Sequence, residues 1–443
     1  MVGKEMKKIA VIGLGYVGLP LALAFSKQGF ETIGIDLDDK KLQVLKEGRS
    51  YIKEISDERV KAAISGKRFS STKDMRRLKE ADVIIICVPT PLTADDEPDM
   101  TYLIQAGASV RDHLRHNQIV VLESSTYPGT TREVLKPMLE QSGLIAGTDF
   151  YLGYSPERVD PGNRSYPLEV IPKVISGITE KCINAVEDVY RTVFQTVVRI
   201  SSTDAAEMTK LLENTYRFVN ISFINEIAQL CTNMGIDVWE VIEVARSKPF
   251  GFSAFFPSPG VGGHCIPVDP VYLQWRSKQF GATSSFIAIS REINNKMPVY
   301  IIERIKEALS RESLSCVKIL VVGVAFKANI DDIRESSSIE MIKLLQREGA
   351  LVSYHDPYVH EITLQGEKLA SYRFNEHERC AYDCAIIAVN HDDLPLQQII
   401  DQVPLVYDTR NALKRMSGKA KIIRLGGEIG VSDERSDIAD STR

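Results

Sequence analysis

A single cysteine among glycines is the residue best suited to covalent chemistry in this sequence. Residues 259–269 read PGVGGHCIPVD, with Cys265 near the centre and Asp269 at the end. Glycines lack a Cβ and so let a substrate approach the thiol closely, and a thiol is the most nucleophilic side chain near neutral pH. A lone cysteine is as often a small buried apolar residue, but the other motifs favour chemistry. We predict that Cys265 is a catalytic nucleophile.

Two polar residues upstream could assist such a nucleophile. Lys210 and Asn214 are four residues apart in a predicted helix over about 201–235, so their side chains share one face. This spacing is also common on solvent-facing helices. Beside a thiolate that attacks a carbonyl, however, an ammonium and an amide would stabilise the oxyanion, each donor contributing about 3–4 kcal/mol.

Three glycines near the start of the chain predict a dinucleotide site. Gly13, Gly15 and Gly18 follow the predicted strand KKIAVIGL and open a helix, and a second strand ends at Asp36. The glycines permit a tight turn and bring a pyrophosphate to the helix N-terminus. Asp36 would accept hydrogen bonds from the ribose hydroxyls and repel a 2′-phosphate, which favours NAD over NADP.

Further candidates follow predicted strands at the same sheet edge. Thr90 in VPTP and Thr126 in SSTYPGT would meet cofactor or water, unless these segments are simple turns. Glu157, beside Arg158 in YSPER, would activate water if it faced a reaction centre and would otherwise be a solvated glutamate.

The second half of the chain shows a different turn after its first predicted strand. Gly323 is followed by Val-Ala-Phe-Lys instead of a glycine triplet. Phe326 would pack on a base or sugar, and Lys327 and Arg334 would meet phosphates. The alternative is a basic loop between strand and helix.

The elements that must position these residues alternate between strand and helix in both halves. This pattern predicts an α/β fold with two Rossmann-like, doubly wound parallel-sheet domains joined by a central helical dimerisation region. We place the domains at residues 1–200, 201–310 and 311–443.

Composition excludes several classes of protein. The 443 residues carry a formal charge of −5 with acids and bases interspersed, so no basic surface for nucleic acid or membrane is expected. The seven cysteines include no CxxC pair, which fits a reducing cytoplasm, and the absence of HExxH or a comparable spacing predicts no metal site. The apolar N-terminal run imitates a signal peptide, but its glycine spacing favours the nucleotide turn.

Seven motifs in chain order carry a family resemblance. They are GLGYVGLP, VPTP, SSTYPGT, YSPER, the Lys210/Asn214 pair, GVGGHCIPVDP and VAFK…RESSS. Together they resemble the UDP-glucose/GDP-mannose dehydrogenase family over nearly the whole chain. The Phe-rich segment before the cysteine loop resembles the UDP-N-acetylglucosamine 6-dehydrogenase branch. His264 and Val268 stand where UDP-glucose dehydrogenases usually carry serine and lysine.

The resemblance implies an N-terminal NAD domain, a C-terminal UDP domain and an assembly of two or more identical chains. It also implies that the C6 alcohol of a UDP-sugar is oxidised twice through a Cys265 thiohemiacetal and thioester, in surface polysaccharide precursor synthesis. The implied catalytic residues are Cys265, Lys210, Asn214, Asp269, Glu157 and Thr126. The implied NAD contacts are Gly13, Gly15, Tyr16, Val17, Gly18, Asp36, Thr90, Thr126 and Arg334. The implied substrate contacts are Glu157, Arg158, Lys210, Asn214, Arg246, Phe256, Gly260, Gly263, Phe326, Lys327 and Arg410.

Several alternatives remain open at the level of sequence. The sugar could be UDP-N-acetylglucosamine, which the resemblance favours, UDP-glucose or UDP-N-acetylmannosamine, because a few pocket contacts decide among them. A 3-hydroxyacid dehydrogenase would share the first domain and a catalytic lysine but needs neither the thiol nor the second α/β half. A non-catalytic NAD-binding protein would not need Cys265, Lys210, Asn214 and Asp269 together.

Overall fold

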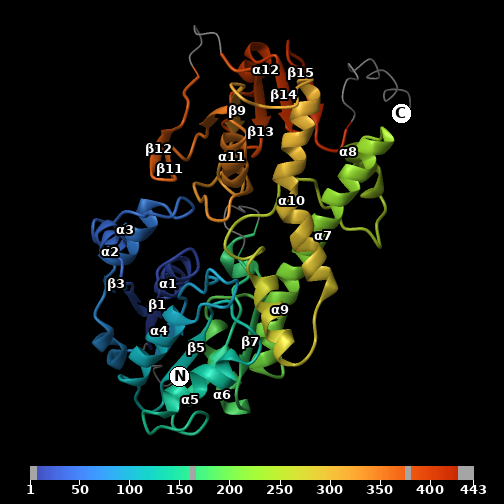
Figure 1. The fold of residues 1–443 in the computed structure, drawn as a ribbon. Helices are drawn as coiled ribbons and strands as arrows, with labels where there is room; N and C mark the ends of the chain where they lie inside the picture. Colours follow the sequence, from blue (N-terminus) through green and yellow to red (C-terminus); the bar gives the residue numbers. More distant parts are fainter. Residues whose placement is uncertain (1–6, 160–165, 375–380, 428–443) are drawn as a thin grey trace, which may run out of the picture. The chain divides into compact units, whose positions relative to one another are not determined.

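The computed structural model describes residues 7–159, 166–374 and 381–427, which divide into two compact units (Figure 1). The first unit comprises residues 1–214 and 268–283, and the second comprises residues 215–267 and 284–443. The finer division into three at residues 200 and 310 stays a prediction.

The first unit is built on an eight-stranded sheet in the order β3-β2-β1-β4-β5-β6-β7-β8. Its strands are β1 (Lys8–Ile12), β2 (Glu31–Ile35), β3 (Phe69–Thr72), β4 (Val83–Ile86), β5 (Ile119–Leu122), β6 (Tyr151–Tyr154), β7 (Lys173–Gly177) and β8 (Val197–Arg199). The first six strands follow the Rossmann order, as the sequence predicts. All neighbours are parallel except β6 and β7, which pair antiparallel.

Helices cover both faces of this sheet because alternate strand residues point to opposite sides. Val11, Ile85 and Val121 enter one apolar cluster, whereas Ile12, Ile86 and Val120 enter another. The helices are α1 (Gly18–Lys27), α2 (Asp39–Lys46), α3 (Asp57–Ser65), α4 (Thr101–Arg111), α5 (Lys136–Glu140), α6 (Glu180–Tyr190) and α9 (Asp269–Gln279), with the shorter helices η1 (Met75–Glu80), η2 (Thr130–Leu135) and η3 (Leu168–Val170). The core is therefore doubly wound, as predicted.

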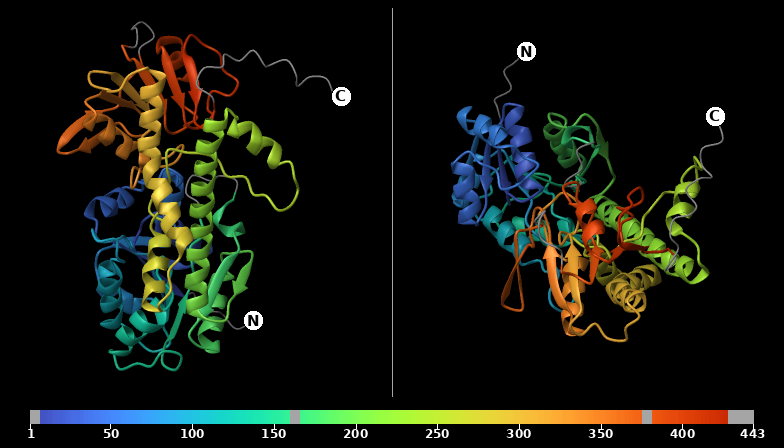
Figure 2. Two further views of the ribbon diagram at one scale, coloured as in Figure 1. Left: turned by 45° about the vertical axis from the view of Figure 1, so that its right-hand side comes forward. Right: turned by 90° about the horizontal axis from the view of Figure 1, so that it is seen from above.

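A helix of 32 residues, α7 (Thr203–Met234), agrees with the long helix predicted over about 201–235. Its residues up to Asn214 belong to the first unit and the rest to the second. In the second unit it packs beside α10 (Ser285–Ala308), where the Ser222 hydroxyl donates to the Ser290 carbonyl at 3.0 Å (Figure 2).

The second unit has a five-stranded, all-parallel sheet in the order β10-β9-β13-β14-β15. Its strands are β9 (Lys318–Val322), β10 (Leu351–His355), β13 (Cys384–Ile387), β14 (Leu405–Asp408) and β15 (Lys421–Arg424), and β11 (Glu361–Leu364) and β12 (Glu367–Ala370) form a separate hairpin. If these five strands are numbered from one to five in chain order, the sheet order is 2-1-3-4-5, which is the flavodoxin-like variant of the doubly wound fold. The topological switch point therefore lies between β9 and β13.

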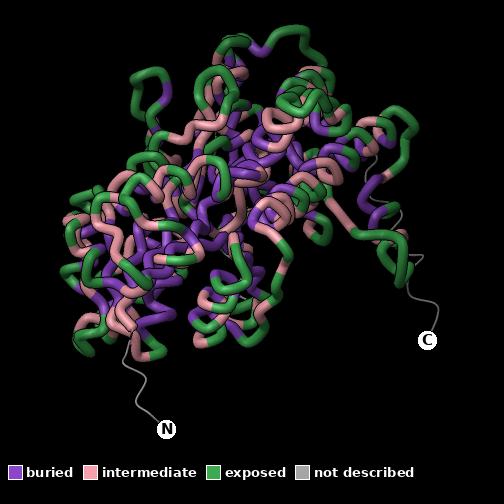
Figure 3. Tube along the Cα trace, turned by 90° about the horizontal axis from the view of Figure 1, so that it is seen from below, coloured by how far each residue is buried: buried purple, intermediate pink, exposed green. Residues whose placement is uncertain are grey.

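The remaining helices of the second unit are α8 (Val238–Ala245), α11 (Ser337–Arg347) and α12 (Leu396–Gln402). Figure 3 shows that the buried stretches of the chain alternate with exposed turns and loops. Among the residues that the structure describes, no helix is long and apolar enough to cross a membrane.

Candidate active site

The glycine turn after β1 has the geometry that a dinucleotide needs. Gly13 has a φ of +90°, and a Cβ there would lie 2.4 Å from the Cys87 carbonyl oxygen. A Cβ on Gly18 would lie 1.8 Å from the Gly13 carbonyl oxygen, so both glycines are required by packing. A Cβ on Gly15 would meet nothing within 4 Å. Gly15 therefore keeps space open at the N-terminus of α1.

The surroundings of this space suit a pyrophosphate and a ribose. The N-terminus of α1 has no side-chain cap and no acidic residue in its first turn, so its free N–H groups attract an anion. Asp36 lies at the end of β2, where one carboxylate oxygen accepts from the Leu14 N–H at 2.8 Å and the other from the Asp38 N–H at 3.0 Å. These residues fit NAD, and the contact of Asp36 with the ribose stays a prediction.

Thr90 and Thr126 are both buried at the carboxyl ends of the central strands. The Thr126 hydroxyl faces the buried Tyr154 hydroxyl, and neither has another hydrogen-bond partner among the described residues. Because these two hydroxyls have hydrogen-bonding capacity left over, Thr126 is a candidate to bind a ligand or a water.

Three buried polar side chains meet in the first unit where α7 lies near the start of α9. Lys210, Asn214 and Asp269 are 9%, 6% and 3% exposed, and the Asn214 amide donates to the Asp269 carboxylate at 2.5 Å. Burial raises the pKa of Asp269 to about 6, although the Lys210 ammonium and the Asn214 amide oppose that rise. Asp269 therefore carries a pKa close to the range in which enzymes transfer protons.

Glu157 has a different environment, because its side chain is buried inside the first unit. One of its carboxylate oxygens accepts from the backbone N–H groups of Arg158 and Val159, both at 2.7 Å, and the other accepts from Lys173 Nζ at 2.8 Å. Burial alone would raise the pKa of Glu157, but the Lys173 ammonium and the N–H groups outweigh it, so the pKa is lowered. Arg158 is paired with Glu213 at 2.7 Å.

The partner of Glu157 belongs to a buried cluster that sequence reasoning missed. Lys173 is 2% exposed, and its Nζ lies 2.7 Å from Glu123 as well. The Tyr190 hydroxyl also donates to Glu123. Burial raises the pKa of Glu123 to about 7 despite the nearby ammonium. No spacing in the sequence reveals this cluster, because its members come from strands β5 and β7 and helix α6.

A second missed residue is Glu207, which is fully buried on α7. Its carboxylate accepts from Gly129 N at 2.6 Å, Thr131 N at 2.8 Å and the Thr131 hydroxyl at 2.7 Å, so it holds the loop that follows Thr126. Its spacing of three and seven residues from Lys210 and Asn214 places all three on one helix face, which is a signal that the sequence contained.

The cysteine loop lies in the second unit against the turn after β9. Gly263 has a φ of +88°, and a Cβ there would lie 2.8 Å from the Phe326 ring. The Gly263 N–H donates to the Arg334 carbonyl at 3.0 Å. Cys265 is partly exposed. Burial and the Arg334 charge lower the pKa of the neighbouring His264. The glycines thus allow the cysteine loop and the Phe326 turn to pack closely.

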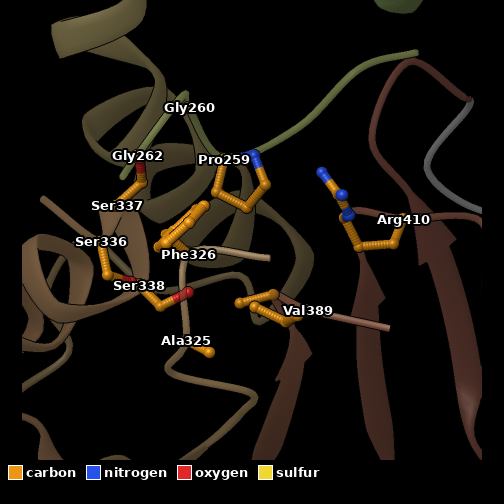
Figure 4. Close-up of a pocket in the computed structure, with 11 residues that line it drawn as sticks. Pro259, Gly260, Gly262, Ala325, Phe326, Ser336, Ser337, Ser338, Val389 and Arg410 are labelled. Atoms are coloured by element: carbon orange, nitrogen blue, oxygen red, sulfur yellow. The ribbon is translucent and has the colours of Figure 1, made fainter. Parts of the chain in front are cut away.

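A pocket opens at the switch point of the second sheet (Figure 4). In Figure 4 the Phe326 ring lies beside Ser337 and Ser338, and Arg410 extends from the other side of the pocket. Its lining residues are Pro259, Gly260, Gly262, Ala325, Phe326, Ser336, Ser337, Ser338, Ala388, Val389 and Arg410. An aromatic ring, hydroxyl groups and a guanidinium suit a nucleoside diphosphate. The sequence did not predict Ser336, Ser337 and Ser338 as pocket residues, although they belong to the RESSS motif.

Three of the predicted site residues have other contacts in the second unit. Arg246 is paired with Glu243 at 2.8 Å, and the Arg334 guanidinium is paired with Asp332 at 2.6 Å. Phe256 is 41% exposed and stacks on Trp239. None of Arg246, Phe256 and Arg334 lines the described pocket, so their roles, like that of Lys327, stay predictions.

Known proteins share these features. Three domains of the UDP-glucose/GDP-mannose dehydrogenase family match the chain: the NAD binding domain over residues 7–194, the central domain over 204–296 and the UDP binding domain over 320–415. A UDP-N-acetyl-D-glucosamine 6-dehydrogenase of Salmonella typhi is 36% identical over 88% of this chain and 91% of its own length. A UDP-N-acetyl-D-mannosamine dehydrogenase of Methanocaldococcus jannaschii is 34% identical over 92% and 93%.

A solved structure of a nucleotide-sugar dehydrogenase also resembles this chain over nearly its whole length. The UDP-D-ManNAc dehydrogenase of Pyrococcus horikoshii is 33% identical, with a TM-score of 0.85 over 95% of this chain and 99% of that one. The glycine turn with Asp36, the pocket of the second sheet and the three matched domains lead to one assignment. The chain belongs to the UDP-glucose/GDP-mannose dehydrogenase family and is an NAD-dependent nucleotide-sugar dehydrogenase.

Proposed function

We propose that the protein oxidises the C6 primary alcohol of UDP-N-acetylglucosamine to the carboxylate in two successive steps. The observation that carries this proposal is the buried group of Lys210, Asn214 and Asp269, of which Asp269 follows Cys265 by four residues in the chain. A cation, an amide donor and a carboxylate of raised pKa supply the oxyanion stabilisation and proton transfer that acyl chemistry on a thiol requires.

The reaction balances as one alcohol, two NAD⁺ and one water giving one carboxylate, two NADH and three protons. When bound, NAD⁺ supplies the hydride acceptor for each oxidation. Cys265 Sγ adds to C6 of the aldehyde to form a thiohemiacetal, which becomes a thioester in the second oxidation. Water then attacks the thioester carbonyl, the C–S bond breaks, and the thiolate of Cys265 is restored. Covalent attachment explains why the aldehyde is not released between the two oxidations.

The role of each remaining residue follows from its surroundings. Lys210 and Asn214 stabilise the oxygen that becomes negative at C6 in each step. Asp269, with its pKa near 6, accepts protons from the alcohol and from water, and the buried hydroxyl of Thr126 orients the water. Glu157, whose oxygens accept from Lys173 and from the N–H groups of Arg158 and Val159, assists thioester hydrolysis by fixing the loop in which it lies.

The UDP moiety is assigned to the pocket of the second sheet, where Phe326 packs on the nucleoside and Arg410 meets the diphosphate. UDP-N-acetylglucosamine is favoured by the Phe-rich segment before the cysteine loop and by the Salmonella typhi relative. A second candidate is UDP-N-acetylmannosamine, because the Methanocaldococcus jannaschii relative is nearly as similar.

The test supplies the purified protein with NAD⁺ and one of three sugars: UDP-N-acetylglucosamine, UDP-N-acetylmannosamine or UDP-glucose. The measured quantity is the number of NADH molecules formed per sugar molecule consumed. We expect two NADH per UDP-N-acetylglucosamine and slow turnover of the other two sugars. One NADH per sugar would remove the thioester step. Two NADH from another sugar alone would keep the mechanism and replace the substrate.

We also propose that the protein is a homodimer formed through α7. Tyr216, Phe223 and Leu230 recur every seven residues on this helix and are 49%, 55% and 48% exposed, so they form an apolar stripe along one face. An exposed apolar stripe of this kind favours association. We expect light scattering to give twice the chain mass and Phe223→Glu to give a monomer. A monomeric wild-type protein at micromolar concentration would contradict the proposal.

A further inference from the structure

A buried aspartate–histidine pair follows two strands of the second sheet. Asp356 follows β10 and His391 follows β13, and each residue is 1% exposed. His391 Nε2 lies 3.1 Å from Asp356 Oδ2. The pair belongs to the same sheet edge as the switch point but does not line the pocket.

Asp356 holds the first part of the turn after β9. Its Oδ2 accepts from Val324 N at 2.8 Å and Ala325 N at 3.3 Å, and its Oδ1 accepts from Tyr358 N at 2.8 Å. Burial would raise the pKa of Asp356, but the bonds from His391 and from these N–H groups outweigh it and lower that pKa. Asp356 is therefore a carboxylate held by the protein's own donors.

His391 holds the last part of the same turn. The Asn329 N–H donates to His391 Nδ1 at 2.9 Å. A nitrogen that accepts a hydrogen bond carries no proton, so the proton of the neutral ring lies on Nε2 and is donated to Asp356. The side chain of Asn329, a residue with a φ of +66°, donates to Asp392 Oδ2 at 2.8 Å and accepts from the Asp392 backbone N–H at 2.9 Å.

The turn after β9 in the second unit can be compared with the dinucleotide turn after β1 in the first unit. Gly13 N donates to Ile35 O at 2.7 Å, and Gly323 N donates to His355 O at 2.8 Å, so the two turns begin alike. The carboxylate one residue beyond, Asp36 or Asp356, then accepts from the N–H after the glycine at 2.8 Å. In the second unit that carboxylate, Asp356, also accepts a hydrogen bond from His391. Asp356 therefore orients a histidine where Asp36 is placed to meet a ribose.

We infer that Asp356 and His391 are positioning residues that fix the loop 324–329 for binding of the UDP moiety. The inference rests on the proposed function, which gives Phe326 of this loop to the sugar nucleotide. Both ends of the loop are held by one pair, and the Phe326 ring between them packs against Gly262 and Gly263. Loss of the Nδ1 acceptor removes the bond to the Asn329 N–H and weakens the hold on that end of the loop, which then depends on the contacts of Asn329 with Asp392.

The experiment measures UDP and NAD⁺ binding by calorimetry for the wild type, His391→Phe and His391→Asn. Phenylalanine fills the ring volume without an acceptor, whereas asparagine keeps an acceptor near the Nδ1 position. We expect His391→Phe, which loses the bonds to both Asn329 and Asp356, to weaken UDP binding about tenfold or more, and His391→Asn, which keeps the acceptor for Asn329, to recover most of it. NAD⁺ binding belongs to the other unit and should change less than about twofold in both variants.

The outcomes separate the inference from the proposed function. If the wild type does not bind UDP, the proposed function fails. If the wild type binds UDP and His391→Phe binds it equally well, or His391→Asn recovers nothing, the inference is wrong. Should His391→Phe fail to fold, ¹⁵N spectra of the wild-type histidines decide, because an Nδ1-protonated His391 at pH 7.5 would overturn the assigned hydrogen bonds and an Nε2-protonated ring would support them.

Discussion

Replacing Cys265 with alanine is expected to lower the rate of acid formation by at least about 10⁴-fold, because the variant lacks the atom that holds the aldehyde for its second oxidation. The Gly262–Gly263 packing on Phe326 does not involve the thiol, so UDP binding should remain within about twofold of the wild type. Stopped-flow absorbance of NADH and titration calorimetry with UDP measure the two effects separately.

Cys316→Ala is the matched control, since Cys316 is an exposed cysteine of the same unit outside the cysteine loop. Its activity should equal that of the wild type. Intact-protein mass spectrometry after acid quench should show the sugar nucleotide attached to the wild type and to Cys316→Ala only. Acid formation by Cys265→Ala within tenfold of the wild-type rate would rule out the covalent mechanism.

Asp269→Asn has the second largest expected effect. The substitution keeps a side chain that can bond to Asn214 but removes the proton acceptor, and we expect kcat to fall by about 10²- to 10⁴-fold. In the wild type, kcat should fall as the pH drops through about 6, because Asp269 then binds a proton and ceases to act as a base. That acidic limb should be absent from the residual activity of Asp269→Asn.

Stability provides the control for this variant. Burial raises the pKa of Asp269 in the folded chain above its value in the unfolded chain, so its ionisation costs folding free energy, fully so above pH 6. Asn carries no charge, and Asp269→Asn should therefore unfold at an equal or higher temperature than the wild type at pH 7.5. A lower unfolding temperature with lost activity would indicate a structural role for Asp269.

Local patterns predicted the parts of the fold that depend on one or two elements. The turn of Gly13, Gly15 and Gly18 and the long helix α7 are visible in sequence because each is set by spacing along one segment. The antiparallel pairing of β7 was not predicted, because a strand's own residues do not specify the direction of its neighbour.

The same distinction applies to the site. Lys210 and Asn214 were predicted from their spacing, and the structure places Asp269 beside them. Glu123, Lys173 and Glu157 became a cluster only when β5, β6 and β7 were adjacent. The pairing of Asp356 with His391 likewise depends on the order of β10, β9 and β13, which hydrophobic patterns do not encode.

The buried ammonium of Lys173 between two carboxylates also limits how this sequence can evolve. Exchange of Lys173 alone for an apolar residue leaves two carboxylates in the interior without a cation, at a cost of about 3–5 kcal/mol, whereas loss of Glu123 leaves a matched pair of Lys173 and Glu157. Concerted replacement by apolar side chains of similar volume is close to neutral in such clusters. The effect of losing Lys173 is therefore epistatic: we expect it to be tolerated only where Glu123 and Glu157 have also been replaced.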